Sequence, residues 1–190
     1  MKRTAATIPI PDQPTEPSSN PDASTIEAGS AMPEELYALV SQQPFFKGLD
    51  PHQLQLLADS AMRMHFEAGQ SIFEEGSPAN RFYLILEGSV ALESEVKDRG
   101  RITIQTLGPG DDLGWSWLFP PFYVHLSARA LGPTKTIFFY GTRLREQCAE
   151  DHELGYQLMT RIAEVATQCL KATQLRLAEC TDTRKLSSNP

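Results

Sequence analysis

The chain has 190 residues, with 17 basic and 24 acidic side chains, so its formal net charge is −7. That length suits one domain, and the acidic balance argues against nucleic acid as the main partner, because phosphate binding needs a dense positive surface. No apolar run approaches the ~18 residues of a membrane span, and the three cysteines lack a C-x-x-C spacing. Composition therefore predicts a soluble cytoplasmic protein with reduced thiols and no membrane partner.

The first 33 residues differ in composition from the rest of the chain. They hold six of the 14 prolines, set among Ser, Thr, Asn and Asp, and no aromatic side chain. Such a segment buries too little apolar surface to offset its ordering entropy, so residues 1–33 are predicted to form a disordered tail. A docking or modification segment is the functional alternative. The folded domain is predicted at 34–181, followed by a frayed polar end at 182–190.

Two short helices are predicted at the start of the domain. The first begins near Pro33, whose fixed φ suits a first helical position, and two glutamates follow where the helix dipole favours negative charge. The second begins with Asp50 as N-cap and Pro51 at the first position. Its apolar residues recur at the helical spacing, namely at Leu54, Leu57, Ala58 and Ala61.

From residue 64 to residue 140 the pattern changes to short strands separated by glycine and proline. The predicted strands are Ile72–Phe73, Phe82–Leu86, Val90–Glu93, Ile102–Leu107 and Thr136–Phe139. Turn residues between them recur every ~8–12 residues, a spacing typical of sandwiches and barrels. The segment is therefore predicted to form a closed antiparallel sandwich or barrel.

After Gly141 the pattern is helical, with one long helix predicted at about 151–180. One apolar seam along it has a heptad-like spacing: Leu158, Ile162, Val165, Cys169 and Ala172. A second seam runs beside it: Met159, Ala163, Ala166, Leu170, Thr173, Leu177 and Cys180. A lone surface helix needs only one apolar face, so one seam is free to pack on the strands while the other meets a partner. We expect a homodimer, with the first seam as its interface; a wide core-facing helix in a monomer is the alternative.

Residues 66–92 read FEAGQSIFEEGSPANRFYLILEGSVAL, in which glycines punctuate an aromatic and aliphatic strand pattern that ends in Gly-x-Val. With helices before it and a long helix after it, this stretch resembles the cyclic-nucleotide-binding domain family, in particular the sensor half of bacterial catabolite-activator-type regulators. The resemblance implies an α+β, mainly β fold: an antiparallel, jelly-roll-like β-roll with N-terminal helices and a long C-terminal helix.

The resemblance also implies where a ligand site belongs. In the family, a glutamate that follows a glycine binds the ribose, and an arginine in an Arg-x-Ala pattern neutralises the phosphate. Here Gly114 matches the glycine, but Trp115 stands at the glutamate position. When the following strand is aligned so that its alanines point inward, Val124 takes the arginine position and Arg129 points outward; a slip of one residue places His125 there instead. Both anchors of a cyclic nucleotide are therefore absent.

An aromatic cluster stands in place of the lost anchors, comprising Trp115, Trp117, Phe119, Phe122 and Tyr123. These side chains either fill the vacated pocket as core or line a reshaped pocket for an apolar or planar ligand stacked on tryptophan. Ser116, His125 and Ser127 are predicted to supply polar contacts to such a ligand. Thr173 lies where the resemblance brings a helix hydroxyl to the base of the nucleotide.

The sequence therefore predicts a non-catalytic, ligand-sensing regulatory module that does not bind cAMP in the usual way. Scattered histidines and helical cysteines argue against a metal, haem or iron–sulfur site, so no cofactor is expected beyond a cyclic nucleotide or another small planar ligand. Few residues follow Glu179, which argues against a helix-turn-helix domain, so a protein partner rather than DNA is expected. A genuine cAMP or cGMP sensor with a divergent pocket is the alternative.

Overall fold

The computed structural model describes residues 33–97 and 99–186, with side chains described for 34–97 and 99–178. The helices are α1 (Pro33–Ser41), η1 (Pro44–Phe46), α2 (Pro51–Ala58), η2 (Trp115–Leu118), α3 (Gly141–Glu150) and α4 (His152–Leu186). The strands are β1 (Met62–Phe66), β2 (Ser71–Phe73), β3 (Arg81–Glu87), β4 (Val90–Val96), β5 (Gly100–Leu107), β6 (Asp112–Leu113), β7 (Ser127–Ala130) and β8 (Thr134–Tyr140). Of the predicted tails at 1–33 and 182–190, residues 1–32 and 187–190 lie outside the described residues. The predicted frayed end is wrong for residues 182–186, because α4 continues through them.

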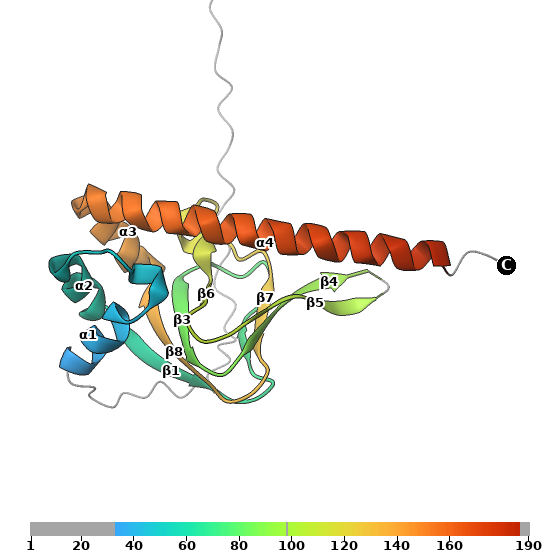
Figure 1. Cartoon of the computed structure of the whole chain (residues 1–190), viewed down its shortest axis with the longest axis horizontal. Coiled ribbons are helices and arrows are strands. Elements are labelled where there is room, and N and C mark those ends of the chain that lie inside the picture. The colour runs from blue at the N-terminus through green and yellow to red at the C-terminus, as the bar shows by residue number, and fades with distance from the viewer. Residues whose placement is uncertain (1–32, 98, 187–190) are drawn as a thin grey trace, which may run out of the picture.

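Two four-stranded antiparallel sheets form the β-roll (Figure 1). Their strand orders are β1-β8-β3-β6 and β2-β7-β4-β5, and the two sheets bury a shared core that includes Tyr83, Leu92 and Phe138. Within the described residues the sheets remain separate, so the predicted sandwich is confirmed and the closed barrel is wrong. The predicted class, an α+β and mainly β fold with helices before and after the roll, is confirmed.

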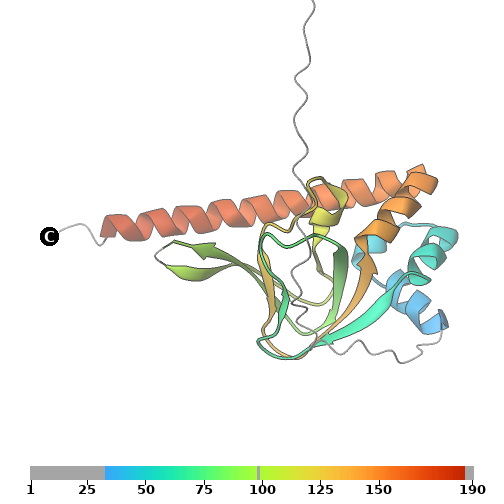
Figure 2. The ribbon, with the colours of Figure 1, turned by 180° about the vertical axis from the view of Figure 1, so that it is seen from behind.

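The helical elements form a second core against the outer face of the first sheet (Figures 1 and 2). Strand β8 serves both cores, because Ile137 and Phe139 face the helices while Phe138 between them faces the opposite sheet. Phe46 of η1 packs edge-to-face on Phe139, with 5.6 Å between ring centroids. Burial on both faces explains why the second half of β8, from Ile137 to Phe139, is a continuous apolar run rather than an alternating one.

The start of α2 shows the predicted cap. The Asp50 carboxylate accepts a hydrogen bond from the backbone N–H of Gln53, while the Gln53 side-chain oxygen accepts one from the backbone N–H of Asp50. This reciprocal capping box satisfies two N–H groups that the helix cannot pair itself, and Pro51 needs no such partner. The predicted start of this helix at Asp50 and Pro51 is therefore confirmed.

Helix α4 runs along the roll and continues past it, beside the hairpin of β4 and β5 (Figures 1 and 2). Its first turns pack on the helical core, where Leu158 and Ile162 are 2% and 0% exposed. Two residues of the predicted dimer interface thus contact the chain's own core, so the assignment of that seam to a partner is wrong for them. The physical reason is that the first seam is the one that faces the roll. In the second seam, Met159 and Leu170 are 51% and 58% exposed.

Candidate ligand-binding site

A cavity of about 80 Å³ lies between the β-roll and α4. Its wall combines strand residues from β2, β4, β5 and β6, the chain that connects β6 to β7, and one face of α4. The lining residues are Phe73, Leu92, Gln105, Leu107, Asp111, Asp112, Leu113, Gly114, Trp115, Ser116, Val124, His125, Leu126, Val165, Gln168 and Cys169. None of these lining residues is a lysine or arginine, so the described wall carries carboxylates but no fixed cation.

Gly114 turns the chain from β6 into η2 at the edge of this cavity. Its φ is +85°, in the left-handed region, and a Cβ at this position would meet the carbonyl oxygen of Arg81 at 2.6 Å. Both the dihedral angle and the close approach of the neighbouring backbone exclude a side chain here. Glycine therefore fixes the path of the chain that delivers Trp115 to the cavity wall.

Trp115, Ser116 and His125 all line the cavity. The rings of Trp115 and His125 lie 5.9 Å apart between centroids and are tilted by 39°, and Ser116 is buried. The chain thus presents an aromatic wall and a hydroxyl group at the place where the sequence predicted them.

The rest of the aromatic cluster lies elsewhere. Trp117 is completely buried in the helical core, where its ring centroid is 6.1 Å from that of Phe82. Phe119, Phe122 and Tyr123 are 38%, 36% and 46% exposed and do not line the cavity. Each interpretation of the cluster therefore holds for one tryptophan: Trp115 lines the cavity, and Trp117 fills the core.

The register of β7 identifies the residue at the position of the family arginine. Ala128 and Ala130 are fully buried in the core between the sheets, which is the alignment that places Val124 at that position. Val124 is itself buried and lines the cavity. Arg129 points to the opposite face of β7 and donates hydrogen bonds from Nε and Nη2 to the two carboxylate oxygens of Glu93. The predicted outward orientation of Arg129 is confirmed.

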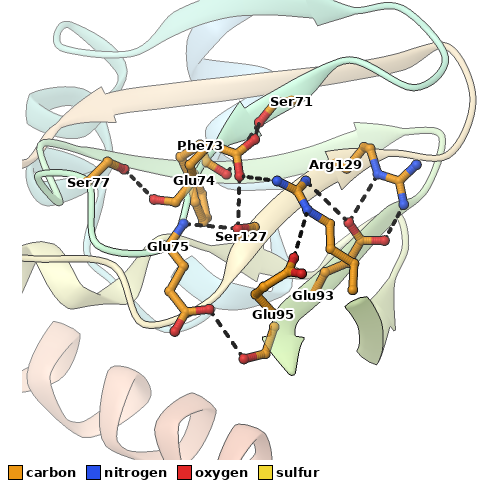
Figure 3. Close-up of polar contacts among 11 residues, drawn as sticks. Ser71, Phe73, Glu74, Glu75, Ser77, Glu93, Glu95, Ser127 and Arg129 are labelled. Carbon is orange, nitrogen blue, oxygen red and sulfur yellow. Dashed lines mark hydrogen bonds and ion pairs between the residues drawn. The ribbon is translucent and has the colours of Figure 1, made fainter. Parts of the chain in front are cut away.

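A polar cluster covers the outer face of the second sheet around this pair (Figure 3). We call it the outer cluster; it comprises Ser71, Phe73 through its carbonyl, Glu74, Glu75, Ser77, Glu93, Ser94, Glu95, Arg101, Ser127 and Arg129. Burial alone would raise the pKa of Glu74, but hydrogen bonds from Ser71 and Ser127 and the charge of Arg101 outweigh it, so the pKa lies below its usual value. Partners within the fold thus favour the ionised form of Glu74.

Two predicted ligand contacts are wrong. The Ser127 hydroxyl belongs to the outer cluster, where it donates to Glu74 at 3.1 Å and accepts from the backbone N–H of Glu75 at 3.0 Å. Alternation along β7 turns Ser127 away from the cavity, because its neighbour Ala128 points inward. Thr173 is exposed and donates to the Cys169 carbonyl at 2.9 Å, one turn beyond the cavity.

Helix α4 contributes other residues to the cavity. Val165 and Cys169, predicted as dimer contacts, line its wall together with Gln168. Burial raises the pKa of the Cys169 thiol. Ala172, the last residue of that predicted interface, is half-buried and lies outside the lining set.

Asp112 is a cavity residue to which the sequence assigned no role. Although the residue as a whole is partly exposed, its Oδ2 atom is buried and has no hydrogen-bond partner among the described residues. Burial, with a smaller contribution from the charge of Asp111, raises its pKa to about 7. The consecutive acidic residues before Gly114, in a segment whose family counterpart binds an anion, are the signal that would have identified it.

The described residues form neither a metal site nor a helix that could span a membrane. Among the side chains described, those of residues 34–97 and 99–178, no group of three or more His, Cys, Asp or Glu is arranged to hold a metal ion. Over the same ranges, no helix combines the length and apolar character that a bilayer crossing requires.

Known proteins resemble this chain in sequence and in fold. A family model described as the cyclic nucleotide-binding domain matches residues 63–151. The CRP-like cAMP-activated global transcriptional regulator of Mycobacterium tuberculosis is 25% identical over 141 residues, which cover 74% of this chain and 61% of the regulator. The chain thus spans 61% of the length of that curated relative, so the match concerns only part of the regulator.

Two solved structures are each 32% identical to this chain. A Brucella abortus protein named as cyclic nucleotide-binding-like matches 59% of this chain and 96% of its own length, with a TM-score of 0.50. A protein of Geobacter metallireducens, named for cyclic nucleotide binding, matches 73% of this chain and 98% of its own length, with a TM-score of 0.62. With this sequence identity, this coverage and the β-roll described above, the chain belongs to the cyclic nucleotide-binding domain family.

Proposed function

We propose that this chain is a non-catalytic, ligand-sensing regulatory module that does not hold cAMP or cGMP in the usual way of its family. The observation that carries the proposal is the replacement of both nucleotide anchors by the cavity residues Trp115 and Val124. Each charge-assisted hydrogen bond to a phosphate contributes about 1.5–3 kcal/mol. Losing the phosphate and ribose contacts together would weaken binding on the order of a thousandfold.

The size and charge of the cavity support the same proposal. Its volume is about 80 Å³, whereas pockets for drug-sized ligands measure about 300–1,000 Å³. The only lining residues with ionisable acidic side chains besides the thiol of Cys169 are Asp111 and Asp112, which oppose a phosphate anion. A cyclic nucleotide would need both a larger space and a cation that the described wall does not offer.

Calorimetry with cAMP, cGMP and cyclic dinucleotides tests this proposal. We expect no binding at micromolar concentration, and micromolar affinity for a mononucleotide would overturn the proposal. A gain-of-function variant makes the test sharper: Trp115→Glu combined with Val124→Arg restores both family anchors. This double variant should bind cAMP more tightly than the native chain, whereas Trp115→Gln with Val124→Met, which changes the shape without the charges, should not.

A cyclic-nucleotide sensor with a divergent pocket is the second candidate, and His125 favours it. This side chain lines the cavity next to the position of the family arginine and contacts Trp115. If it contacts the phosphate, His125→Ala should abolish nucleotide binding, while His152→Ala, at an exposed site on α4, should leave it unchanged. Nucleotide affinity that survives His125→Ala would remove this candidate.

We propose further that the module works in the cytoplasm as a homodimer through the second seam of α4, and passes its signal to a partner protein. Met159 and Leu170 are more than half exposed on this seam, whereas the polar residues Glu164 and Lys171 lie roughly 100° or more around the helix from it. An apolar stripe on a long helix favours packing against a second helix. Leu158 and Ile162 of the first seam are buried in the chain's own core and are not available for this contact.

Light scattering of matched variants tests the dimer. The native chain should have twice the mass of a monomer. Leu170→Glu should yield a monomer, because the interface would bury an unpaired charge. Thr160→Glu adds the same charge on the polar side of α4 and should leave the dimer intact; a monomeric native chain would refute the proposal.

A further inference from the structure

The cavity wall includes a carboxylate, that of Asp112, with one oxygen that the described fold leaves unpaired. Oδ2 of Asp112 is buried without a partner among the described residues, although a buried carboxylate oxygen left unpaired is costly. The Asp112 backbone pairs with Leu84 in β3, so the strand ladder fixes the residue in place. A ligand that donates a hydrogen bond would supply the missing partner.

The cavity wall also offers a surface for an aromatic ring, formed by Trp115 and His125. Their rings form a tilted pair with centroids 5.9 Å apart in the cavity wall. An indole ring attracts a planar cation both by stacking and through its negative face. No lining lysine or arginine opposes such a cation, and the neighbouring carboxylate of Asp111 favours it.

We propose that this cavity binds a small planar organic cation with N–H donors, of the amidinium or protonated aminoheterocycle class, whose N–H groups bond to Asp112 and whose ring lies against Trp115. The inference rests on the proposed function, because it names the class of ligand sensed by the same cavity. A volume of about 80 Å³ is smaller than the ~150 Å³ cavity that encloses benzene, so it admits the planar cationic group while the ring extends toward the open side of the cavity. The amide of Gln168 and the hydroxyl of Ser116 lie in the same wall and are available for further donors or acceptors.

Calorimetry of the full chain at pH 8 with three compounds of matched shape tests the charge preference. The probes are benzamidine, a cation; benzamide, its neutral counterpart; and benzoate, an anion. We expect benzamidine to bind at least about tenfold more tightly than benzamide, because a hydrogen bond to an ionised group is stronger than one between neutral groups. Benzoate should bind most weakly. Equal affinity for benzamidine and benzamide, preference for benzoate, or no binding of benzamidine at millimolar concentration would each overturn the inference.

Three variants locate the contact. Asp112→Asn should lower benzamidine affinity about tenfold or more and leave benzamide nearly unchanged, since it removes the charge but keeps the shape. Trp115→Leu should weaken benzamidine and benzamide alike, because both lose the stacking surface. Asp59→Asn removes an exposed charge at the end of α2 and should change nothing. A benzamidine affinity unaffected by Asp112→Asn would refute the assigned contact.

Failure of this inference and failure of the proposed function give different results. If benzamidine does not bind and the mononucleotides do not bind either, the ligand class is wrong while the loss of the nucleotide site stands. If cAMP binds at micromolar concentration, the proposed function is wrong as well.

Discussion

The ligand cavity and the outer cluster occupy opposite faces of the same strands, and they differ in whether their carboxylates are paired within the fold. Leu92 lines the cavity, and the next residue of β4, Glu93, belongs to the outer cluster. The side chain of Glu93 is only 3% exposed, and its carboxylate accepts two hydrogen bonds from Arg129. Asp112, in contrast, has a buried oxygen with no partner among the described residues. A carboxylate satisfied within the chain indicates a structural role, and one left unsatisfied next to a cavity indicates a ligand.

The largest expected effect of this contrast is on the pH dependence of stability. The pKa of Asp112 is raised to about 7 in the folded chain, above its value of 3.8 without the fold, so the folded state holds the proton more tightly. Stability should therefore fall as the pH rises from about 4 to about 7, by up to about 4 kcal/mol. Asp112→Asn, which cannot ionise, should be more stable than the native chain at pH 8, with a difference that shrinks toward pH 4.

Denaturant unfolding of both proteins across this pH range measures the difference. The other titratable groups in the cavity wall are Asp111, His125 and Cys169. Benzamidine should reverse part of the effect at pH 8, because a bound cation stabilises the ionised carboxylate. If Asp112→Asn has the stability of the native chain at both ends of the range, the carboxylate is solvated and the contrast between the two regions fails.

A pair of glycines compares the two regions at the level of the backbone. Gly114 borders the cavity with φ at +85°, and Gly76 lies next to the outer cluster with φ at +81°. An added Cβ at Gly114 would lie 2.6 Å from the Arg81 carbonyl oxygen, whereas at Gly76 it would meet nothing within 4 Å. Gly76→Ala should cost about 1 kcal/mol through its dihedral angle alone, and Gly114→Ala about 2–3 kcal/mol.

Urea unfolding gives both costs, and calorimetry with benzamidine separates them further. Gly114→Ala should also lose ligand affinity, because the displaced chain carries Trp115. Equal costs at the two glycines would mean that the backbone next to Gly114 yields easily, and that the glycine is not needed to set the cavity wall.

The sequence predicted the architecture well because the architecture depends on local patterns. Five predicted strands correspond to β2, β3, β4, β5 and β8, and the cap at Asp50 formed as expected. Strand β1 begins at Met62, two residues before the position where the sequence predicted the strand region to begin. Strand β6 has only two residues, too few to show a recognisable pattern. Strand length and side-chain alternation were thus the useful signals, and they fade in the shortest strands.

The site was only partly predictable because it depends on which residues meet in space. Trp115, Ser116, Val124 and His125 were expected in the cavity and lie there, since one continuous segment carries them. The prediction that Ser127 contacts a ligand was wrong, because a single step along β7 moves a side chain to the other face of the sheet. On α4, both apolar seams satisfy the same helical spacing, so only tertiary packing shows that Leu158 and Ile162 belong to the core.

The smallest expected effect concerns the outer cluster. Arg129→Met leaves the buried Glu93 carboxylate with only Arg101, whose Nη1 atom is 4.0 Å away, so the thermal midpoint should fall by a few degrees at pH 7. Because Arg129 is solvent-exposed, water compensates part of the loss. The deficit should be largely rescued by Arg129→Met with Glu93→Leu, because the second substitution removes the carboxylate that Arg129 pairs with. Arg99→Met, at another exposed arginine, is the control. Benzamidine affinity should be unchanged in all three variants; a change would show that the two faces of β4 are coupled and would end the separation of structural from ligand-binding carboxylates.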